Sequence, residues 1–201
     1  MGLPCFSLDP ALPLASLLID KGIRDFCQAA RWVQGLTYGR NLPAADYLRV
    51  VAERRGTCST KHAFLAALAR EHNKPIRLML GIYEMSGENT PGVGTVLDAW
   101  RLAGIPEAHC YLAYKGNRYD FTRDPSLQPP ISAFLVERSI APEEIGSFKR
   151  FFHQTFMKEW CTTRGLALDQ AWQAREACIA ALSSDSREAH SSASSPDPFG
   201  T

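Results

Sequence analysis

Cys58, His109 and Asp120 are the residues of this chain whose types and order suit nucleophilic catalysis. Cys58 follows a glycine-containing turn and precedes an amphipathic stretch, so we expect it at the N-terminus of a helix. The free N–H groups and partial positive charge at that position stabilise a thiolate and can hold an oxyanion. A cysteine nucleophile also needs a base and a third group that orients the base. His109 begins a predicted strand 51 residues after Cys58, and acidic residues follow on the next strand.

Two acids, Asp120 and Asp124, compete to orient His109, and the turn of the predicted hairpin decides between them. If Gly116-Asn117 forms a two-residue turn, His109 lies opposite Asp124, and Asp120 is four strand residues away, about 13 Å. If the loop is four residues long, Asp120 lies diagonal to His109 and within reach in a twisted sheet. One reason to expect that Asp120 is the orienting acid is the apolar residue that precedes it.

Three segments carry a resemblance to the transglutaminase-like superfamily. Gly56-Thr57-Cys58-Ser59-Thr60-Lys61-His62-Ala63 resembles its nucleophile motif, in which Gly, any residue and Cys open the central helix. His109-Cys110-Tyr111-Leu112 is similar to its His strand, and Tyr119-Asp120-Phe121-Thr122 to its apolar-Asp-x-Thr strand. The resemblance covers roughly residues 40–125. It implies a papain-like fold with Cys58 as nucleophile, His109 as general base and later acid, and Asp120 as orienting acid.

The implied activity is amide or peptide hydrolysis, or acyl transfer, through a thioester on Cys58. Ser59 stands where the family often has an aromatic residue, which argues against protein cross-linking as such. The substrate would be a peptide, a protein or a small amide. We expect no cofactor and no metal, because the chain has no calcium-binding pattern of spaced acids.

Two other classes of function stay open at this point. The same fold can serve as a catalytically silent module that binds a peptide or protein. Cys58 and His62 are four residues apart, so both could lie on one helical face and ligate a metal. Otherwise we expect His62 to be exposed or at a pocket rim, Cys110 to lie in the core, and three late residues to pack internally: His153, Trp160 and Trp172. The loop over residues 86–94 either crosses over structurally or borders the active cleft.

The elements that must position these residues indicate an α+β domain, with helices packed on a small antiparallel sheet. Hydrophobic periodicity predicts a strand over residues 76–85 and a hairpin over 109–122. It also predicts helices near residues 23–33, 43–51, 58–73, 95–103, 142–162 and 168–182.

Composition sets the remaining limits. The chain has 201 residues, 45% of them hydrophobic, and a net charge of +1, which argues against a broad nucleic-acid surface. We expect one domain over residues 1–182 and a disordered tail over 183–201, which holds seven serines. No apolar run is long enough to span a membrane. The six cysteines show no C-x-x-C spacing and no secretion signal precedes them, so we expect reduced thiols and a cytoplasmic location.

Overall fold

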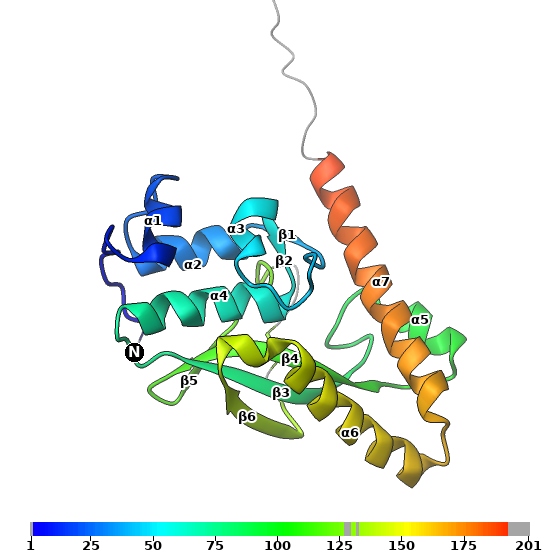
Figure 1. The fold of residues 1–201 in the computed structure, drawn as a ribbon. Helices are drawn as coiled ribbons and strands as arrows, with labels where there is room; N and C mark the ends of the chain where they lie inside the picture. Colours follow the sequence, from blue (N-terminus) through cyan, green and yellow to red (C-terminus); the bar gives the residue numbers. More distant parts are fainter. Residues whose placement is uncertain (1, 127–129, 132, 193–201) are drawn as a thin grey trace, which may run out of the picture.

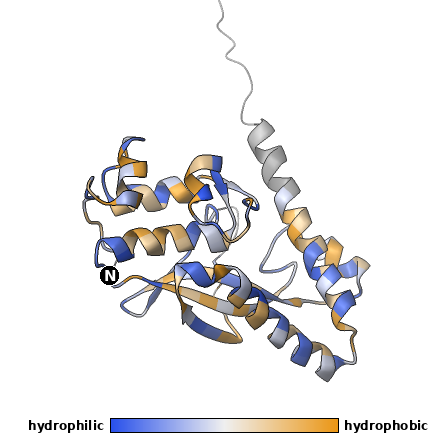
Figure 2. Ribbon diagram, viewed as in Figure 1, coloured by the Kyte–Doolittle hydropathy of each residue, from blue (hydrophilic) through white to orange (hydrophobic). Residues whose placement is uncertain are grey.

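The structure, a computed structural model, describes residues 2–126, 130–131 and 133–192. At its centre lies helix α4 (Cys58–Glu71), which is buried at every position from Cys58 to Ala69. Helices α1 (Pro13–Ile19) and α2 (Phe26–Gln34) cover one side of α4, and a β-sheet covers the other (Figure 1). Hydrophobic residues occupy the middle of α4 (Figure 2), as expected of a helix enclosed on all sides.

The main sheet has four strands, each antiparallel to its neighbours, so the predicted α+β class with a small antiparallel sheet is confirmed. A separate two-stranded parallel sheet brings the residues just before Cys58 beside the segment that follows α2. In the main sheet the order is β5 (Asn117–Tyr119), β4 (Ile105–Tyr114), β3 (Arg77–Met85) and β6 (Val136–Ile140), and the small sheet pairs β1 (Thr37–Tyr38) with β2 (Arg55–Gly56).

The β4–β5 hairpin turns one residue earlier than the Gly116-Asn117 alternative, and it has the register expected of the four-residue loop. Lys115 and Gly116 form its two-residue loop, and both have positive φ, 47° and 79°. Such a pair of left-handed residues is typical of the type I′ turn, whose twist matches that of the strands. The resulting register pairs Leu112 with Tyr119. Asp120, which follows, therefore comes diagonal to His109.

Several helices begin or end at different residues from those predicted. The helix expected from residue 43 is confined to α3 (Arg49–Glu53), because the Asp46 carboxylate accepts the Leu48 N–H at 3.0 Å and holds a turn instead. Helix α5 (Gly94–Ala99) stops before residue 103, since Arg101 adopts a left-handed conformation with φ of 56°. Strand β6 was not predicted.

The last third of the chain forms two long helices that pack against each other beside the sheet (Figure 1). The helix expected over 142–162 is divided at Gly146, whose ψ of −108° is not helical, into the 3₁₀ turn η1 (Pro142–Ile145) and α6 (Ser147–Arg164). Helix α7 (Leu168–Ser192) continues past the domain end expected at residue 182. Ser183 Oγ donates to the Ile179 carbonyl at 2.9 Å, a bond compatible with the continuing helix. Residues 193–201 of the expected tail lie outside the described residues.

Interior contacts hold the two C-terminal helices to strand β4. His153 and Trp160 are buried, as expected, and His153 Nε2 donates to the Pro106 carbonyl at 2.8 Å. The Trp172 ring lies 5.1 Å from the His153 ring, so it also packs internally.

Two of the six cysteines are joined, which corrects the expectation of reduced thiols throughout. Cys5 and Cys27 form a disulfide with their Cα atoms 5.2 Å apart. This bond fixes the N-terminal segment to α2. Disulfides are typical of oxidising compartments, so the bond does not support the cytoplasmic location expected above. The other four cysteines are free and buried.

Candidate active site

Cys58 is the first residue of α4, and its neighbours fix the helix start. Thr57 and Thr60 form a capping box in which each side chain binds the backbone N–H of the other. Gly56 is required here, because a Cβ at that position would lie 2.9 Å from both Lys61 Cγ and Thr60 Oγ1. The N–H groups of Cys58 and Ser59 point out of the first turn, where a helix provides no backbone acceptor. The helix start is therefore rigid and presents two donors beside the thiol.

The structure brings Cys58, His109 and Asp120 together. His109 Nε2 donates to Asp120 Oδ2 at 2.6 Å. The His109 side chain and the Cys110 backbone N–H both interact with the Cys58 sulfur in the sense that stabilises its thiolate. Because Nε2 is used by Asp120, Nδ1 is the nitrogen left for the sulfur. Cys58 and His109 are each 7% exposed, so the pair is largely shielded from water.

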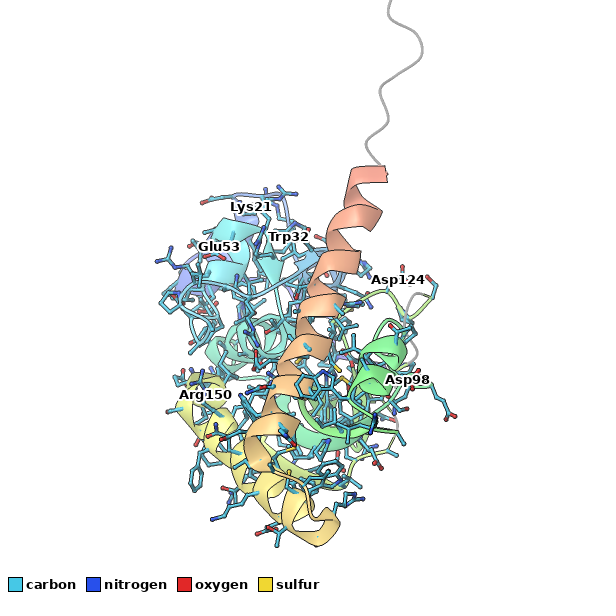
Figure 3. All side chains as sticks on the ribbon, turned by 90° about the vertical axis from the view of Figure 1, so that its right-hand side faces the viewer. Lys21, Trp32, Glu53, Asp98, Asp124 and Arg150 are labelled. Atoms are coloured by element: carbon cyan, nitrogen blue, oxygen red, sulfur yellow. A yellow bond between two sulfur atoms is a disulfide. The ribbon has the colours of Figure 1, made fainter. Side chains whose placement is uncertain are left out.

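Asp124, the competing acid, lies elsewhere. Figure 3 shows it at the margin of the molecule, and its carboxylate accepts hydrogen bonds from the Ser126 N–H at 2.9 Å and the Ser126 hydroxyl at 2.8 Å. Asp120 is held by its own loop, since its second oxygen accepts the Thr122 N–H at 2.9 Å. Asp120 is thus the acid that the fold orients toward His109.

The electrostatics favour an ion pair between Cys58 and His109. Burial raises the pKa of the Cys58 thiol, but the Lys149 ammonium and the His109 imidazolium outweigh it and lower that pKa from 9.0 to about 6. Burial lowers the pKa of His109, but the Asp120 carboxylate and the Cys58 thiolate raise it to about 10. Burial raises the pKa of Asp120 too, yet His109 holds it far below its ordinary value. Near neutral pH the site therefore contains a thiolate, an imidazolium and a carboxylate.

His62 is fully buried, so the expectation of an exposed or rim position is wrong. The Phe121 N–H donates to its Nε2 at 2.7 Å, so the proton sits on Nδ1, which donates to the Cys58 carbonyl at 2.7 Å. Burial lowers the pKa of His62 to about 4, which keeps the ring neutral. Both ring nitrogens thus tie the start of α4 to the segment that carries Asp120.

The alternative of a metal site at Cys58 and His62 finds no support in this arrangement, because both His62 nitrogens already make hydrogen bonds. Among the residues that the structure describes, no group of three or more His, Cys, Asp or Glu side chains is arranged to hold a metal ion.

Lys149 of α6 is part of the site and was missed by the sequence analysis. Its Nζ donates to Ser59 Oγ at 2.6 Å and lies 3.9 Å from the Cys58 sulfur. Burial lowers the pKa of Lys149, but the Cys58 thiolate and other anions raise it by more than that. The net shift is upward, so the ammonium persists. Lys149 is 91 residues from Cys58 in sequence, and no local pattern connects the two.

A second lysine, the fully buried Lys61, fastens the loops around the site. Its Nζ donates to three backbone carbonyls: Leu36 at 2.6 Å, Thr122 at 2.8 Å and Gln34 at 3.2 Å. These contacts join the end of α2 and the segment after Asp120 to the first turn of α4. Burial lowers the pKa of Lys61 to about 7.

Tyr38 and the Glu107–Arg175 ion pair also adjoin the site. Burial, followed by the negative charges of Cys58 and Glu107, raises the pKa of the Tyr38 hydroxyl well above its usual value. Arg175 of α7 makes a two-pronged contact with Glu107 of β4, at 2.6 and 2.7 Å. Glu107 lies two residues before His109, so this pair anchors α7 to the strand that carries the imidazole.

The loop over residues 86–94 helps to line a cavity of about 690 Å³. Phe134 also lines this cavity, and its ring stacks against His109 with centroids 6.4 Å apart. In addition, the Tyr83 hydroxyl, 3.2 Å from Thr90 Oγ1, links the loop to a ring that packs 6.1 Å from His109. The loop thus contacts residues that pack on His109, but Cys58, His109 and Asp120 do not line this cavity, so both of its predicted roles stay predictions.

Comparison with known proteins adds no further assignment. No family model, curated protein or solved structure matches the chain. Within the described residues, no helix has the length and apolar character needed to cross a membrane.

Proposed function

We propose that this protein is a cysteine-dependent amide or peptide hydrolase, or an acyltransferase, of the transglutaminase-like type. The observation that carries the proposal is the contact of Cys58, at the N-terminus of a buried helix, with a His109 ring held by Asp120 at 2.6 Å. A nucleophile, a base beside it and an acid that orients the base form the general arrangement of covalent catalysis by a thiol.

The proposed reaction begins with the ion pair already formed. The Cys58 thiolate attacks the substrate carbonyl carbon, an S–C bond forms, and the carbonyl electron pair moves to oxygen. When the tetrahedral intermediate collapses, the C–N bond breaks and the His109 imidazolium gives its proton to the leaving amine. The product is a thioester on Cys58. Neutral His109 then takes a proton from water or from a second amine, which attacks the thioester and regenerates the thiolate.

The papain-like fold is also part of this proposal. The chain has a cysteine-bearing helix, then a histidine-bearing strand, then an aspartate after the next strand. This order agrees with the resemblance to the transglutaminase-like superfamily. Cys110 in the core and the packing of α4 against β4 are consistent with it.

A catalytically silent binding module is the second candidate, and one observation favours it. Cys58 is only 7% exposed, so a substrate must enter a site that leaves little of the sulfur accessible. The same fold could bind a peptide or protein without chemistry.

Acylation by p-nitrophenyl acetate tests the proposal. We expect a burst of p-nitrophenolate and one added acetyl group, located on Cys58 by peptide mapping. Cys58→Ser should abolish the burst, whereas Cys161→Ser, a change at another buried free thiol, serves as the matched control and should retain it. A wild-type protein that reacts no faster than Cys58→Ser would reject the enzyme and leave the binding module.

A further inference from the structure

We propose that Lys149 supplies the second oxyanion donor, beside the N–H groups at the start of α4. This inference rests on the proposed function and names the group that stabilises the charged oxygen of its tetrahedral intermediate. In this role Lys149 is a catalytic residue additional to the triad of Cys58, His109 and Asp120.

The position of the Lys149 ammonium suits this role. Its Nζ lies 3.9 Å from the attacking sulfur, and Ser59 Oγ fixes it at 2.6 Å. An ammonium has three N–H donors. Among the described residues, Ser59 and Cys58 are the acceptors that Lys149 reaches, so one donor is left for a ligand at the sulfur.

The movement of charge during the reaction explains why the cation is needed. In the resting site the negative charge lies on the Cys58 sulfur. When the sulfur attacks the carbonyl carbon, this charge moves to the carbonyl oxygen. A fixed ammonium next to the sulfur remains close to that oxygen. Since Cys58 and His109 are largely shielded from water, donors that are already in place beside them stabilise the new charge without reorganisation.

Lys61 shows by contrast what a structural lysine looks like in this protein. Its Nζ donates to three backbone carbonyls, which use all three N–H groups. Lys149 instead faces a hydroxyl and the nucleophile. The two lysines therefore differ in the chemistry of their acceptors.

Two reactions of Cys58 separate an oxyanion donor from a residue that merely stabilises the thiolate. Alkylation by iodoacetamide displaces iodide and forms no oxyanion, whereas acylation by p-nitrophenyl acetate passes through one. Both rates are measured for Lys149→Gln at a pH where Cys58 is fully ionised. We expect the alkylation rate to change by less than about tenfold and the acylation rate to fall on the order of 10²-fold, the usual effect of removing one such donor.

Three further variants complete the design. Lys149→Arg keeps the charge and should recover much of the acylation rate. Ser59→Ala frees the ammonium from its hydroxyl partner, and should lower acylation more than alkylation even if Lys149→Gln folds poorly. Lys158→Gln removes an exposed lysine of the same helix and should match the wild type.

Equal losses in both reactions, in Lys149→Gln and in Ser59→Ala, would overturn the oxyanion role while leaving the proposed function intact. A wild-type protein that is alkylated but never acylated at Cys58 would overturn the proposed function and this inference with it.

Discussion

The ionisation of Cys58 can be measured directly from the pH dependence of its alkylation. The thiol pKa is lowered from 9.0 to about 6 by Lys149 and His109, against the opposing effect of burial. Because only the thiolate reacts, the rate should rise as the pH passes through about 6 and level off well below the pH at which an ordinary cysteine ionises.

The size of the effect follows from that shift. Near pH 7 a pKa of about 6 gives roughly nine-tenths thiolate, against roughly one hundredth for a pKa of 9.0, which is about a 90-fold difference. A thiolate of lower pKa is also a weaker nucleophile, with a Brønsted coefficient of about 0.4–0.5. Over three pKa units this lowers its intrinsic rate roughly 20-fold, so the net gain near pH 7 is only about fourfold. The midpoint of the profile is therefore the decisive quantity, rather than the rate.

The assay is limited iodoacetamide labelling at a series of pH values, followed by peptide mapping. Burial raises the pKa of the other three free thiols, Cys110 to about 12, and Cys161 and Cys178 in the same direction. They should stay unlabelled near neutral pH. His109→Asn removes one of the two cations and should move the Cys58 midpoint upward, with folding verified by circular dichroism.

A wild-type midpoint at or above about 8.5, the value of an unperturbed cysteine, would refute the ion-pair reasoning. Faster labelling of Cys110 than of Cys58 near neutral pH would refute it equally.

The remaining predictions concern the residues around the imidazole. Asp120→Asn should keep the fold but lower the acylation rate by up to about 10⁴-fold, as the equivalent change does in a Ser–His–Asp enzyme, because the imidazole loses its orienting carboxylate; Asp124→Asn should match the wild type, and similar rates for the two variants would contradict the assignment. Acylation of an amide substrate should also decline as the pH rises through about 10, where His109 loses the proton that the leaving amine needs; a profile that stays flat to higher pH would show that His109 is not the acid. Arg175→Met should destabilise the protein by about 3–5 kcal/mol in urea unfolding, since it leaves the buried Glu107 carboxylate without its partner; a loss below about 1 kcal/mol would show that water reaches this carboxylate.

Local patterns in the sequence were sufficient to locate the central elements. The helix of Cys58 and the strand over residues 76–85 were predicted within two residues of α4 and β3, because both contain apolar residues between clear ends. Strand β6 was missed, since its residues after Val136 are mostly polar and exposed and show little periodicity. Gly146 divided a helix that looked continuous, because one residue with non-helical backbone leaves the periodicity of its neighbours unchanged.

The candidate site was predictable where it depends on residues close in sequence. The preference for Asp120 over Asp124 depended on a hairpin register, and the structure has the register in which Asp120 reaches His109 through a turn at Lys115 and Gly116. The link from His62 Nδ1 to the Cys58 carbonyl has the four-residue spacing of one helical turn, but that spacing was interpreted as a possible metal site. Lys149 had no such signal, because only the packing of α6 brings it to Cys58.

The disulfide between Cys5 and Cys27 places opposite chemical demands on one chain. A reductant strong enough to protect the Cys58 thiolate in the test tube also threatens the bond that secures the N-terminal segment. An oxidant that preserves the bond exposes the thiolate to sulfenic acid formation, to which cysteines of low pKa are most susceptible. The storage buffer, the purification buffer and the cellular compartment must therefore all meet the same condition. Each must keep the Cys5–Cys27 pair oxidised and the Cys58 sulfur reduced.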